Sequence, residues 1–381
     1  MDFALTEEQE LLRNSLSRYL QDDYDFDTRR SRLTAGHGRD PKLWDDFANL
    51  LGILGAPLPE SVGGLGGGAV ETMIIMEELG ASLVIEPYLE TVVVGGGLLK
   101  RIGGDAGDAL LSGIIAGTSR IALAAMEPAG RFNIGHVGTT ARRDGNGWVI
   151  DGFKSVVVDG ADASTLLVTA RTSGADQDPA GISLFRVDRD TPGLEVHSYQ
   201  LVDERPAADI GFKAVRVEGD ALLGNEGEAL ALVQQVQDEA VAALCAEAVG
   251  VMRRMLNDTV AYTRERKQFG QPLASFQALQ HRMVDMYMAL EQSISATYLA
   301  TLKLGAPAAE RGRAAAAAKA TIGRAARFIG QNAVQLHGAM GMTEELPVGH
   351  YFRRTTVIEH QFGSVDHHVA RYGQLLEGEA A

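Results

Sequence analysis

The most informative segment of this chain reads Tyr262-Thr263-Arg264-Glu265-Arg266-Lys267-Gln268-Phe269-Gly270-Gln271-Pro272-Leu273, and Phe276-Gln277 follow shortly after it. Apolar residues at helical spacing precede and follow the segment. The spacing predicts helices over about residues 228–265, 276–304, 308–337 and 364–376. Four helices joined by short loops indicate an antiparallel bundle in the C-terminal part of the chain.

The middle of the chain, about residues 119–223, has the period-two alternation and β-branched content of short strands. Turn signals such as Asp144-Gly145-Asn146-Gly147 separate these segments. Several short strands at this spacing favour an antiparallel barrel or sandwich. The predicted strands are Trp148-Val149-Ile150, Val156-Val157-Val158, Leu166-Leu167-Val168-Thr169 and Ile182-Ser183-Leu184-Phe185.

The first region of the chain reads as helices. Thr6 followed by Gln9 is a capping-box pattern, and a second helix is expected over residues 70–80. The glycine cluster of residues 63–68 is interpreted as a connector, because turn residues precede it where a dinucleotide-binding loop would need a strand. The chain is therefore predicted to be α+β, with an α-helical domain (1–118), a β-domain (119–223) and a helical-bundle domain (224–381).

Composition and charge exclude several classes of protein. The 381 residues carry a formal net charge of −15 without a basic stripe, which argues against a nucleic-acid partner. The single cysteine, Cys245, cannot form an internal disulfide and is interpreted as a small core residue. The most apolar stretch, residues 92–99, is too short to span a bilayer, and the acidic N-terminus has no signal core. We therefore expect a cytoplasmic protein without a membrane span.

Three landmarks of the chain resemble those of one enzyme family. Residues 266–273 with Phe276-Gln277 are similar to the Arg-x-x-Phe-Gly-x-Pro…Phe-Gln signature of acyl-CoA dehydrogenases. Gln335-Leu336-His337-Gly338-Ala339-Met340-Gly341 resembles the family's Gln-x-x-Gly-Gly-x-Gly segment, and Met126-Glu127-Pro128 its Thr-Glu-Pro segment. The landmarks span the chain in the family's order, so the resemblance implies that the β-domain is an antiparallel barrel between a helical domain and a four-helix bundle.

The resemblance also implies a reaction and a cofactor. A carboxylate base would remove the α-proton of an acyl-CoA, and the β-hydrogen would pass as hydride to FAD, leaving an enoyl-CoA; an electron-transfer flavoprotein would accept the electrons. FAD would lie across a subunit boundary, with its ring on the β-domain of one chain and its pyrophosphate and adenosine on the bundle of a neighbour. The family positions expected to bind it here are Arg266, Gln268, Phe269, Gln277, Gln335, Gly338, Ala339 and Gly341.

Arg266 suits the pyrophosphate because a guanidinium fork binds phosphate oxygens in a bidentate manner. Taken by itself, Arg266 could instead pair with Glu265 or Asp258 on a helix face. Gln335, Gly338 and Gly341 match a segment where the backbone approaches the cofactor, which small residues permit.

The two family positions for the catalytic base hold other residues here. Counting from Phe352-Arg353 places Phe362 on the glutamate of the bundle loop, and counting back from Phe269 places Ala240 on the alternative helical position. Neither side chain accepts a proton. Glu239 is rotated about 100° from the direction of Ala240, and Asp238 further still. Glu359, three positions before Phe362, is a weak candidate that would need a remodelled loop.

The flavin-facing segments depart from the family in a matching way. The Lys-x-Trp-Ile-Thr-Asn strand reads Lys154-Ser155-Val156-Val157-Val158-Asp159, so the stacking Trp and the hydrogen-bonding Thr are both replaced by valine. Met126 stands where the family has a flavin-facing hydroxyl, and the phosphate-binding Ser is not evident in residues 129–133. The residues expected to bind the nucleotide end of a neighbour's FAD match the family pattern, whereas the residues expected to bind the flavin ring and the substrate do not.

This asymmetry leads to the hypothesis of a non-catalytic subunit in a heterotetramer whose partner chain carries the Glu and binds most of the acyl-CoA. Residues 348–354 and 362–368 look like the small subunit of pimeloyl-CoA dehydrogenase, and similar unequal pairs serve in steroid side-chain oxidation. Two alternatives are a self-sufficient homo-oligomer with a displaced base and a non-flavin acyl-CoA-binding or scaffold pseudoenzyme. The His367-His368 pair is not expected to bind metal, because adjacent helical residues do not share a face.

Overall fold

The computed structural model describes residues 4–35 and 39–380, which form two compact units. The helical unit consists of Met1–Gly36, Ala69–Val84 and Val241–Ala381, and the sheet unit of His37–Gly68 and Ile85–Ala240. The division falls within the long helix α7 (Ala229–Glu265). The predicted class, helices with a β-domain between them and a C-terminal helical bundle, is confirmed.

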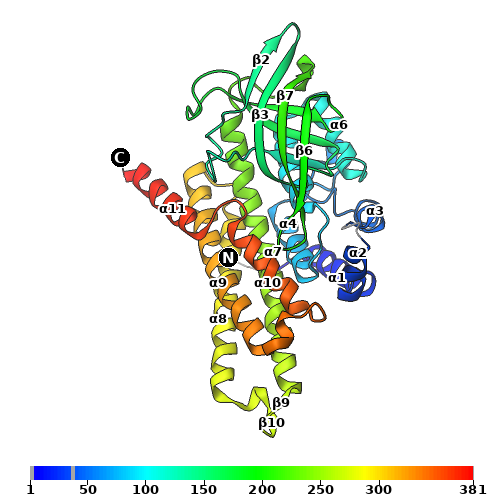
Figure 1. Cartoon of the computed structure of the whole chain (residues 1–381), viewed down its shortest axis with the longest axis vertical. Helices are drawn as coiled ribbons and strands as arrows, with labels where there is room; N and C mark the ends of the chain where they lie inside the picture. The colour runs from blue at the N-terminus through cyan, green and yellow to red at the C-terminus, as the bar shows by residue number, and fades with distance from the viewer. Residues whose placement is uncertain (1–3, 36–38, 381) are drawn as a thin grey trace. The chain divides into compact units, whose positions relative to one another are not determined.

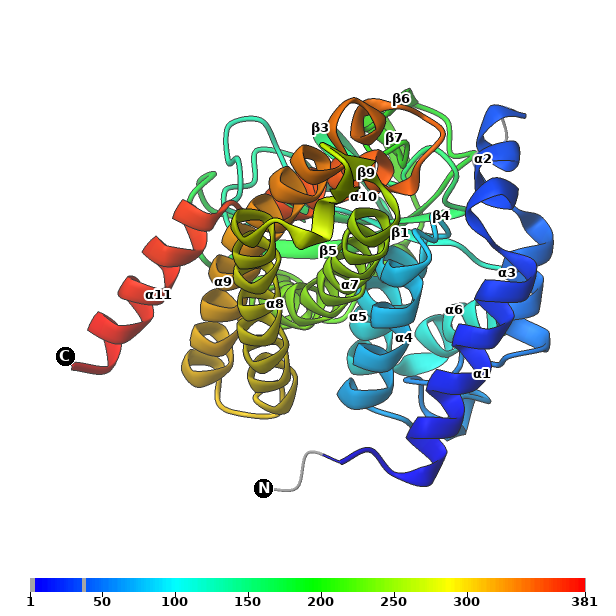
Figure 2. The same cartoon turned by 90° about the horizontal axis from the view of Figure 1, so that it is seen from below.

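Long helices build the bundle of the helical unit. They are α7, α8 (Gln277–Leu302), α9 (Ala308–His337), α10 (Pro347–His360) and α11 (Val365–Ala380). Figure 2 shows α8 and α9 side by side, and both α10 and α11 pack on α9. The Ala-rich part of α9 is a strong helix former and lies largely buried among the others.

Helix α10 was not among the predicted helices. It begins with Pro347 at its first turn, and its buried apolar residues Val348, Tyr351 and Ile358 keep helical spacing. Arg354 interrupts that stripe in the sequence because its guanidinium is buried against α7, where Nε and Nη2 each lie 2.7 Å from the carboxylate of Glu247. A buried bidentate ion pair thus replaces an apolar contact, which a hydrophobicity pattern does not reveal.

The N-terminal helices of this unit agree with the sequence pattern. They are α1 (Glu7–Asp23), α2 (Phe26–Thr34) and α4 (Ala69–Ala81). The capping box is confirmed, since Thr6 Oγ1 accepts from the Gln9 backbone N–H at 3.2 Å and Gln9 Oε1 from that of Thr6 at 3.1 Å. Gly80 and Gly250 leave no space for a Cβ, which lets α4 approach α7 closely.

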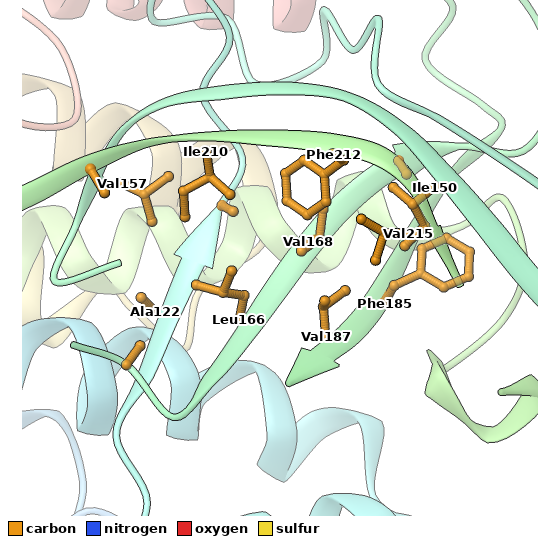
Figure 3. Close-up of a cluster of buried hydrophobic side chains, with 14 of the residues drawn as sticks. Ala122, Ile150, Val157, Leu166, Val168, Phe185, Val187, Ile210, Phe212 and Val215 are labelled. Atoms are coloured by element: carbon orange, nitrogen blue, oxygen red, sulfur yellow. The ribbon is translucent and has the colours of Figure 1, made fainter. Parts of the chain in front are cut away.

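The sheet unit is built on eight strands with a buried core (Figures 1 and 3). Their order is β6 (Leu194–Gln200), β7 (Pro206–Val217), β3 (Gly147–Val158), β2 (Thr140–Asp144), β4 (Thr165–Arg171), β5 (Ile182–Asp188) and β8 (Leu222–Leu223), with β1 (Ile121–Ala124) paired to β4. The four predicted strands lie in β3, β4 and β5, where they contribute Ile150, Leu166 and Phe185 to the core. Helices α3 (Pro41–Asn49), α5 (Gly96–Ile102) and α6 (Gly104–Ile115) belong to the same unit.

The sheet is mostly but not fully antiparallel. β1 pairs with β4 in parallel, and Thr140 of β2 also pairs in parallel with Arg171 of β4. The β2–β3 hairpin intervenes between β1 and β4 in the chain, so the chain returns to β4 in the same direction as β1, as a parallel pair requires. The glycine cluster lies in a loop after a 3-10 turn at Glu60–Val62, which agrees with a connector.

A short hairpin of β9 (Lys267–Gln268) and β10 (Gln271–Pro272) joins α7 to α8. Phe269 and Gly270 form its turn with φ values of 55° and 80°. Two successive residues at positive φ are what a tight hairpin turn of this handedness requires. The predicted interruption of the helical pattern is therefore a hairpin at one end of the bundle (Figure 1).

Candidate functional site

An aromatic contact brings the two C-terminal landmarks to the same end of the bundle. Tyr262, near the end of α7, stacks on His337 at the end of α9 with ring centroids 4.4 Å apart, and its hydroxyl donates to the His337 carbonyl at 3.3 Å. Burial lowers the pKa of His337, so the ring is neutral near pH 7 and donates from Nδ1 to the Ala333 carbonyl. Residues within one helical turn of this contact therefore lie at the same end of the bundle.

Arg266 and Gln335 are two of these residues, and Gln277 begins the helix that follows the hairpin. All three side chains are exposed. Within residues 4–35 and 39–380, Arg266 has no ion-pair partner. The alternative pairing with Asp258 is not found, because the Asp258 carboxylate accepts from Arg254 Nε at 3.0 and 3.1 Å. The Arg266 guanidinium is thus available to an anionic ligand.

The hairpin presents the other predicted positions at its tip and edge. Gln268 is exposed, and Phe269 is 90% exposed; its ring lies edge-on to the ring of Phe276, with the ring centroids 6.1 Å apart. An exposed aromatic side chain at the tip of a turn offers apolar area to a ligand or to a second chain.

The glycine segment after α9 forms a 3-10 turn, η5 (Gly338–Met342). Gly338 has φ 62° and ends α9, while a Cβ on Gly341 would lie 2.7 Å from the Val334 carbonyl oxygen. Both positions therefore require glycine for local reasons. Gly338 and Ala339 are exposed and Gly341 is buried beneath them, so a stretch of backbone is open to a ligand beside Gln335.

Both predicted base positions hold side chains without a proton acceptor in the structure. Phe362 lies in the short loop between α10 and α11, half-buried and with φ 58°. Ala240 is completely buried within α7, and so is Val241 beside it.

The neighbouring carboxylates are engaged elsewhere. Arg327 holds both oxygens of Glu359, with Nε 3.0 Å from Oε2 and Nη2 in contact with Oε1. Glu239 forms an ion pair with Arg101. Asp238 is buried on the same turn of α7. A general base must be free to approach the proton it abstracts, so these pairings disfavour Glu359 and Glu239 in that role.

Lys154 forms a buried ion pair on the strand of the β-domain that resembles the Lys-x-Trp-Ile-Thr-Asn segment. Lys154 Nζ is fully buried and lies 2.7 Å from Glu127 Oε1 and 3.0 Å from Thr169 Oγ1. Glu127 also accepts from the backbone N–H groups of Gly138 and Thr139 at 2.7 and 3.1 Å. Burial lowers the pKa of Lys154 to about 8, against the opposing effect of Glu127. This pair fastens the Met126-Glu127-Pro128 turn to β3.

The exposed part of the same strand is irregular and aliphatic. The register between β3 and β7 shifts between Lys154 and Val157, and Val156 has φ 51°, which is rare for a β-branched residue. Asp209 Oδ1 accepts from the Val156 backbone N–H and from the Tyr199 hydroxyl, each at 2.9 Å. Val156 and Val158 offer no aromatic ring and no hydroxyl, so these residues do not fit a flavin ring as the family's Trp and Thr would.

The helix–sheet–bundle order and the paired landmarks are those of a flavin-dependent dehydrogenase that acts on acyl-CoA thioesters. Models of the acyl-CoA dehydrogenase N-terminal, middle and C-terminal domains match residues 6–108, 122–215 and 230–373. The chain belongs to the acyl-CoA dehydrogenase family, which is FAD-dependent.

Individual relatives cover nearly the whole chain. Acyl-CoA dehydrogenase fadE12 of Mycobacterium tuberculosis is 31% identical over 91% of this chain and 90% of its own length. A variant of the Tcur3481–Tcur3483 steroid ACAD has a chain with 30% identity and a TM-score of 0.88, covering 98% of this chain and 99% of that one. A chain of the ChsE4–ChsE5 complex from Mycobacterium tuberculosis has 25% identity and a TM-score of 0.90, and the match covers 99% of both chains.

No helix in the described part of the chain is long and apolar enough to cross a membrane.

Proposed function

We propose that this chain is the non-catalytic subunit of a heteromeric acyl-CoA dehydrogenase. It would complete the FAD site of a partner chain that carries the catalytic Glu. The observation that supports this most strongly is an asymmetry between its two half-sites. Arg266, Gln277 and Gln335 are exposed and unengaged at the bundle end, whereas Phe362 and Ala240 occupy the two base positions.

The chain's own residues would bind and orient the cofactor rather than move a proton. Arg266 would hold pyrophosphate oxygens through its fork of N–H donors, and Gln335 with the exposed backbone at Gly338 would contact the nucleotide end. Gln268, Phe269, Gln277, Ala339 and Gly341 are proposed to complete this surface. FAD, when bound, supplies the hydride acceptor, and the partner's β-domain would hold the ring, because Val156 and Val158 do not.

The surface of α8 supports assembly with a second chain. Large apolar side chains at helical spacing are about half exposed along it, namely Val284, Tyr287, Met288, Leu299 and Leu302. An open groove of 540 Å³ runs between α7 and α8, lined by Val260, Met283, Val284 and Tyr287 with Arg264 and Gln280. Such a row is uncommon on a monomer surface and is typical of protein interfaces.

The names of similar proteins support an unequal pair. The Tcur3481–Tcur3483 and ChsE4–ChsE5 structures are each named for two different components. Together with the likeness to the pimeloyl-CoA dehydrogenase small subunit, this favours an α₂β₂ assembly in the cytoplasm. Its substrate would be a dicarboxylyl, fatty or steroid acyl-CoA, and an electron-transfer flavoprotein would accept its electrons.

Purification with and without the partner tests this function. The chain expressed alone is expected to be colourless and inactive, whereas co-expression with a partner carrying the Glu should give about one FAD per pair of chains.

Arg266→Ala should reduce the FAD content of the complex, and Arg324→Ala, which removes an exposed cation elsewhere on the bundle, should not. Full flavin occupancy and turnover by this chain alone would overturn the proposal. An Arg266→Ala variant with normal FAD and normal partner activity would favour a scaffold pseudoenzyme instead.

A further inference from the structure

A buried lysine holds the loop that carries Phe362. Lys319, in the middle of α9, is completely buried, and its Nζ donates to the Glu359 carbonyl at 3.0 Å and to the Gly363 carbonyl at 2.8 Å. Burying an ammonium group is expensive unless it is well solvated by the protein. These two carbonyl groups lie on either side of Phe362, so one side chain from α9 fixes both ends of the loop.

A buried histidine from α11 holds the point between them. His368 is 1% exposed, and its Nε2 lies 3.0 Å from the Phe362 carbonyl oxygen. Burial, reinforced by the charge of Lys319, lowers the pKa of His368 to about 3, so the ring is neutral. Its single proton must be on Nε2, where the acceptor is. Within the described residues Nδ1 has no hydrogen-bond partner, so the Phe362 carbonyl is the only group there to which this ring is hydrogen-bonded.

The loop backbone is strained and closely packed. Phe362 has φ 58° and Gly363 has φ 120°. A positive φ is unfavourable for a bulky residue such as Phe, so surrounding contacts must stabilise this backbone conformation. A Cβ on Gly363 would lie 2.5 Å from His367 Cδ2 and 2.9 Å from His368 Nε2. The His367 and His368 side chains therefore pack directly against the loop backbone, and they can do so because residue 363 is glycine.

We propose that Lys319 and His368 are positioning residues that fix the direction in which the side chain at position 362 is presented. Together they form a loop clamp that binds three main-chain carbonyl groups, those of Glu359, Phe362 and Gly363. The clamp uses no atom of the side chain at 362, and the carboxylate of Glu359 is held separately by Arg327. Position 362 can therefore carry either a carboxylate or a phenyl ring on the same backbone.

This inference rests on the proposed function only for the identification of position 362 with the lost base. The clamp explains how a catalytic glutamate at position 362 could be replaced while the loop keeps its conformation. The contacts that hold the loop come from Lys319 of α9 and His368 of α11. The clamp itself is independent of FAD content and turnover.

Hydrogen exchange of the full-length chain, followed by mass spectrometry, tests the clamp. Lys319→Met and His368→Leu are each expected to speed exchange in the peptide covering residues 360–366 by about tenfold or more, while α8 peptides stay unchanged. His368→Gln should retain the protection, because its amide N–H can still donate to the Phe362 carbonyl. Arg324→Met, an exposed cation on α9, is the matched control and should change nothing.

A substitution at position 362 supplies the second measurement. Phe362→Glu should leave exchange of the same peptide close to that of the wild type, since the clamp binds only main-chain atoms there. Equal protection in His368→Leu and the wild type would overturn the proposal. So would a loss of protection in Phe362→Glu as large as in His368→Leu. If Lys319→Met does not fold, the difference in exchange of the 360–366 peptide between His368→Leu and His368→Gln still tests the proposal.

Discussion

Arg266 and Glu359 illustrate opposite situations at the scale of single residues. Arg266 is an exposed cation without an ion-pair partner in the described part of the chain, at the end of the bundle where Gln335 and the η5 backbone are also exposed. Glu359 is a buried carboxylate whose two oxygens are both held by Arg327. A site for an anionic ligand remains open, whereas the acid three positions before Phe362 is already engaged.

We therefore expect Glu359→Gln and Glu239→Gln to leave turnover of the assembled complex unchanged, because neither carboxylate is free to take a proton. Steady-state rates of the two variants with the partner present measure this. A large fall in turnover with flavin retained would instead identify a displaced base and favour the self-sufficient enzyme.

The two buried lysines predict a pH effect on stability. Burial lowers the pKa of Lys154 and of Lys319 to about 8 from the ordinary value of 10.5. Between these values the unfolded chain binds more protons than the folded one, so stability should rise with pH from about 8 to 10.5. Each lysine would contribute up to about 1 kcal/mol per pH unit. Denaturant unfolding at pH 8 and 10 checks this, and Lys154→Met should reduce the pH dependence.

At the scale of elements, the strands and helices differ in how much the sequence revealed. Helix α9 was predicted with its observed bounds, because Pro307 precedes it and Gly338 ends it. The Val156-Val157-Val158 run reads as a regular strand, but Asp209 draws the Val156 N–H out of the ladder and a bulge results. The carbonyl groups that Lys319 binds and the Glu247 carboxylate that Arg354 binds lie 40 or more residues away in the chain, so no local pattern could show them.

The glycine turn η5 gives a prediction for an element. Gly341→Ala should displace η5, because its Cβ would lie 2.7 Å from the Val334 carbonyl oxygen. We expect a loss of stability of about 1–3 kcal/mol and a lower FAD content of the complex. Thermal unfolding and flavin absorbance measure the two effects. Gly305→Ala is the control, since a Cβ there meets nothing within 4 Å; equal behaviour of both variants would contradict the role of η5.

At the scale of the whole molecule, the three sequence landmarks predict the family and the order of its parts, and the matches to the N-terminal, middle and C-terminal domain models confirm both. The domain boundaries 1–118, 119–223 and 224–381 remain predictions, as does the sharing of FAD between chains. What the sequence could not supply is the surface: the half-exposed row on α8 follows only from knowing which side of that helix its neighbours cover.

That surface predicts an effect on assembly. Tyr287→Glu or Met288→Glu should weaken association with the partner chain by about tenfold or more, because a charge would replace apolar contact area. Light scattering of co-purified chains over a dilution series measures this. Arg324→Glu, an exposed charge change on α9 rather than on α8, should assemble normally. Unaltered assembly of Tyr287→Glu would place the partner elsewhere.

The aromatic tip of the β9–β10 hairpin has a consequence for the cell. Under the proposed function, a chain without its counterpart would leave Phe269 and the half-exposed row on α8 in water. Exposed apolar patches of this kind are aggregation liabilities, so copies made in excess would be prone to aggregate. Co-expression of the two chains, as from neighbouring genes transcribed together, would limit the time for which this apolar surface is exposed.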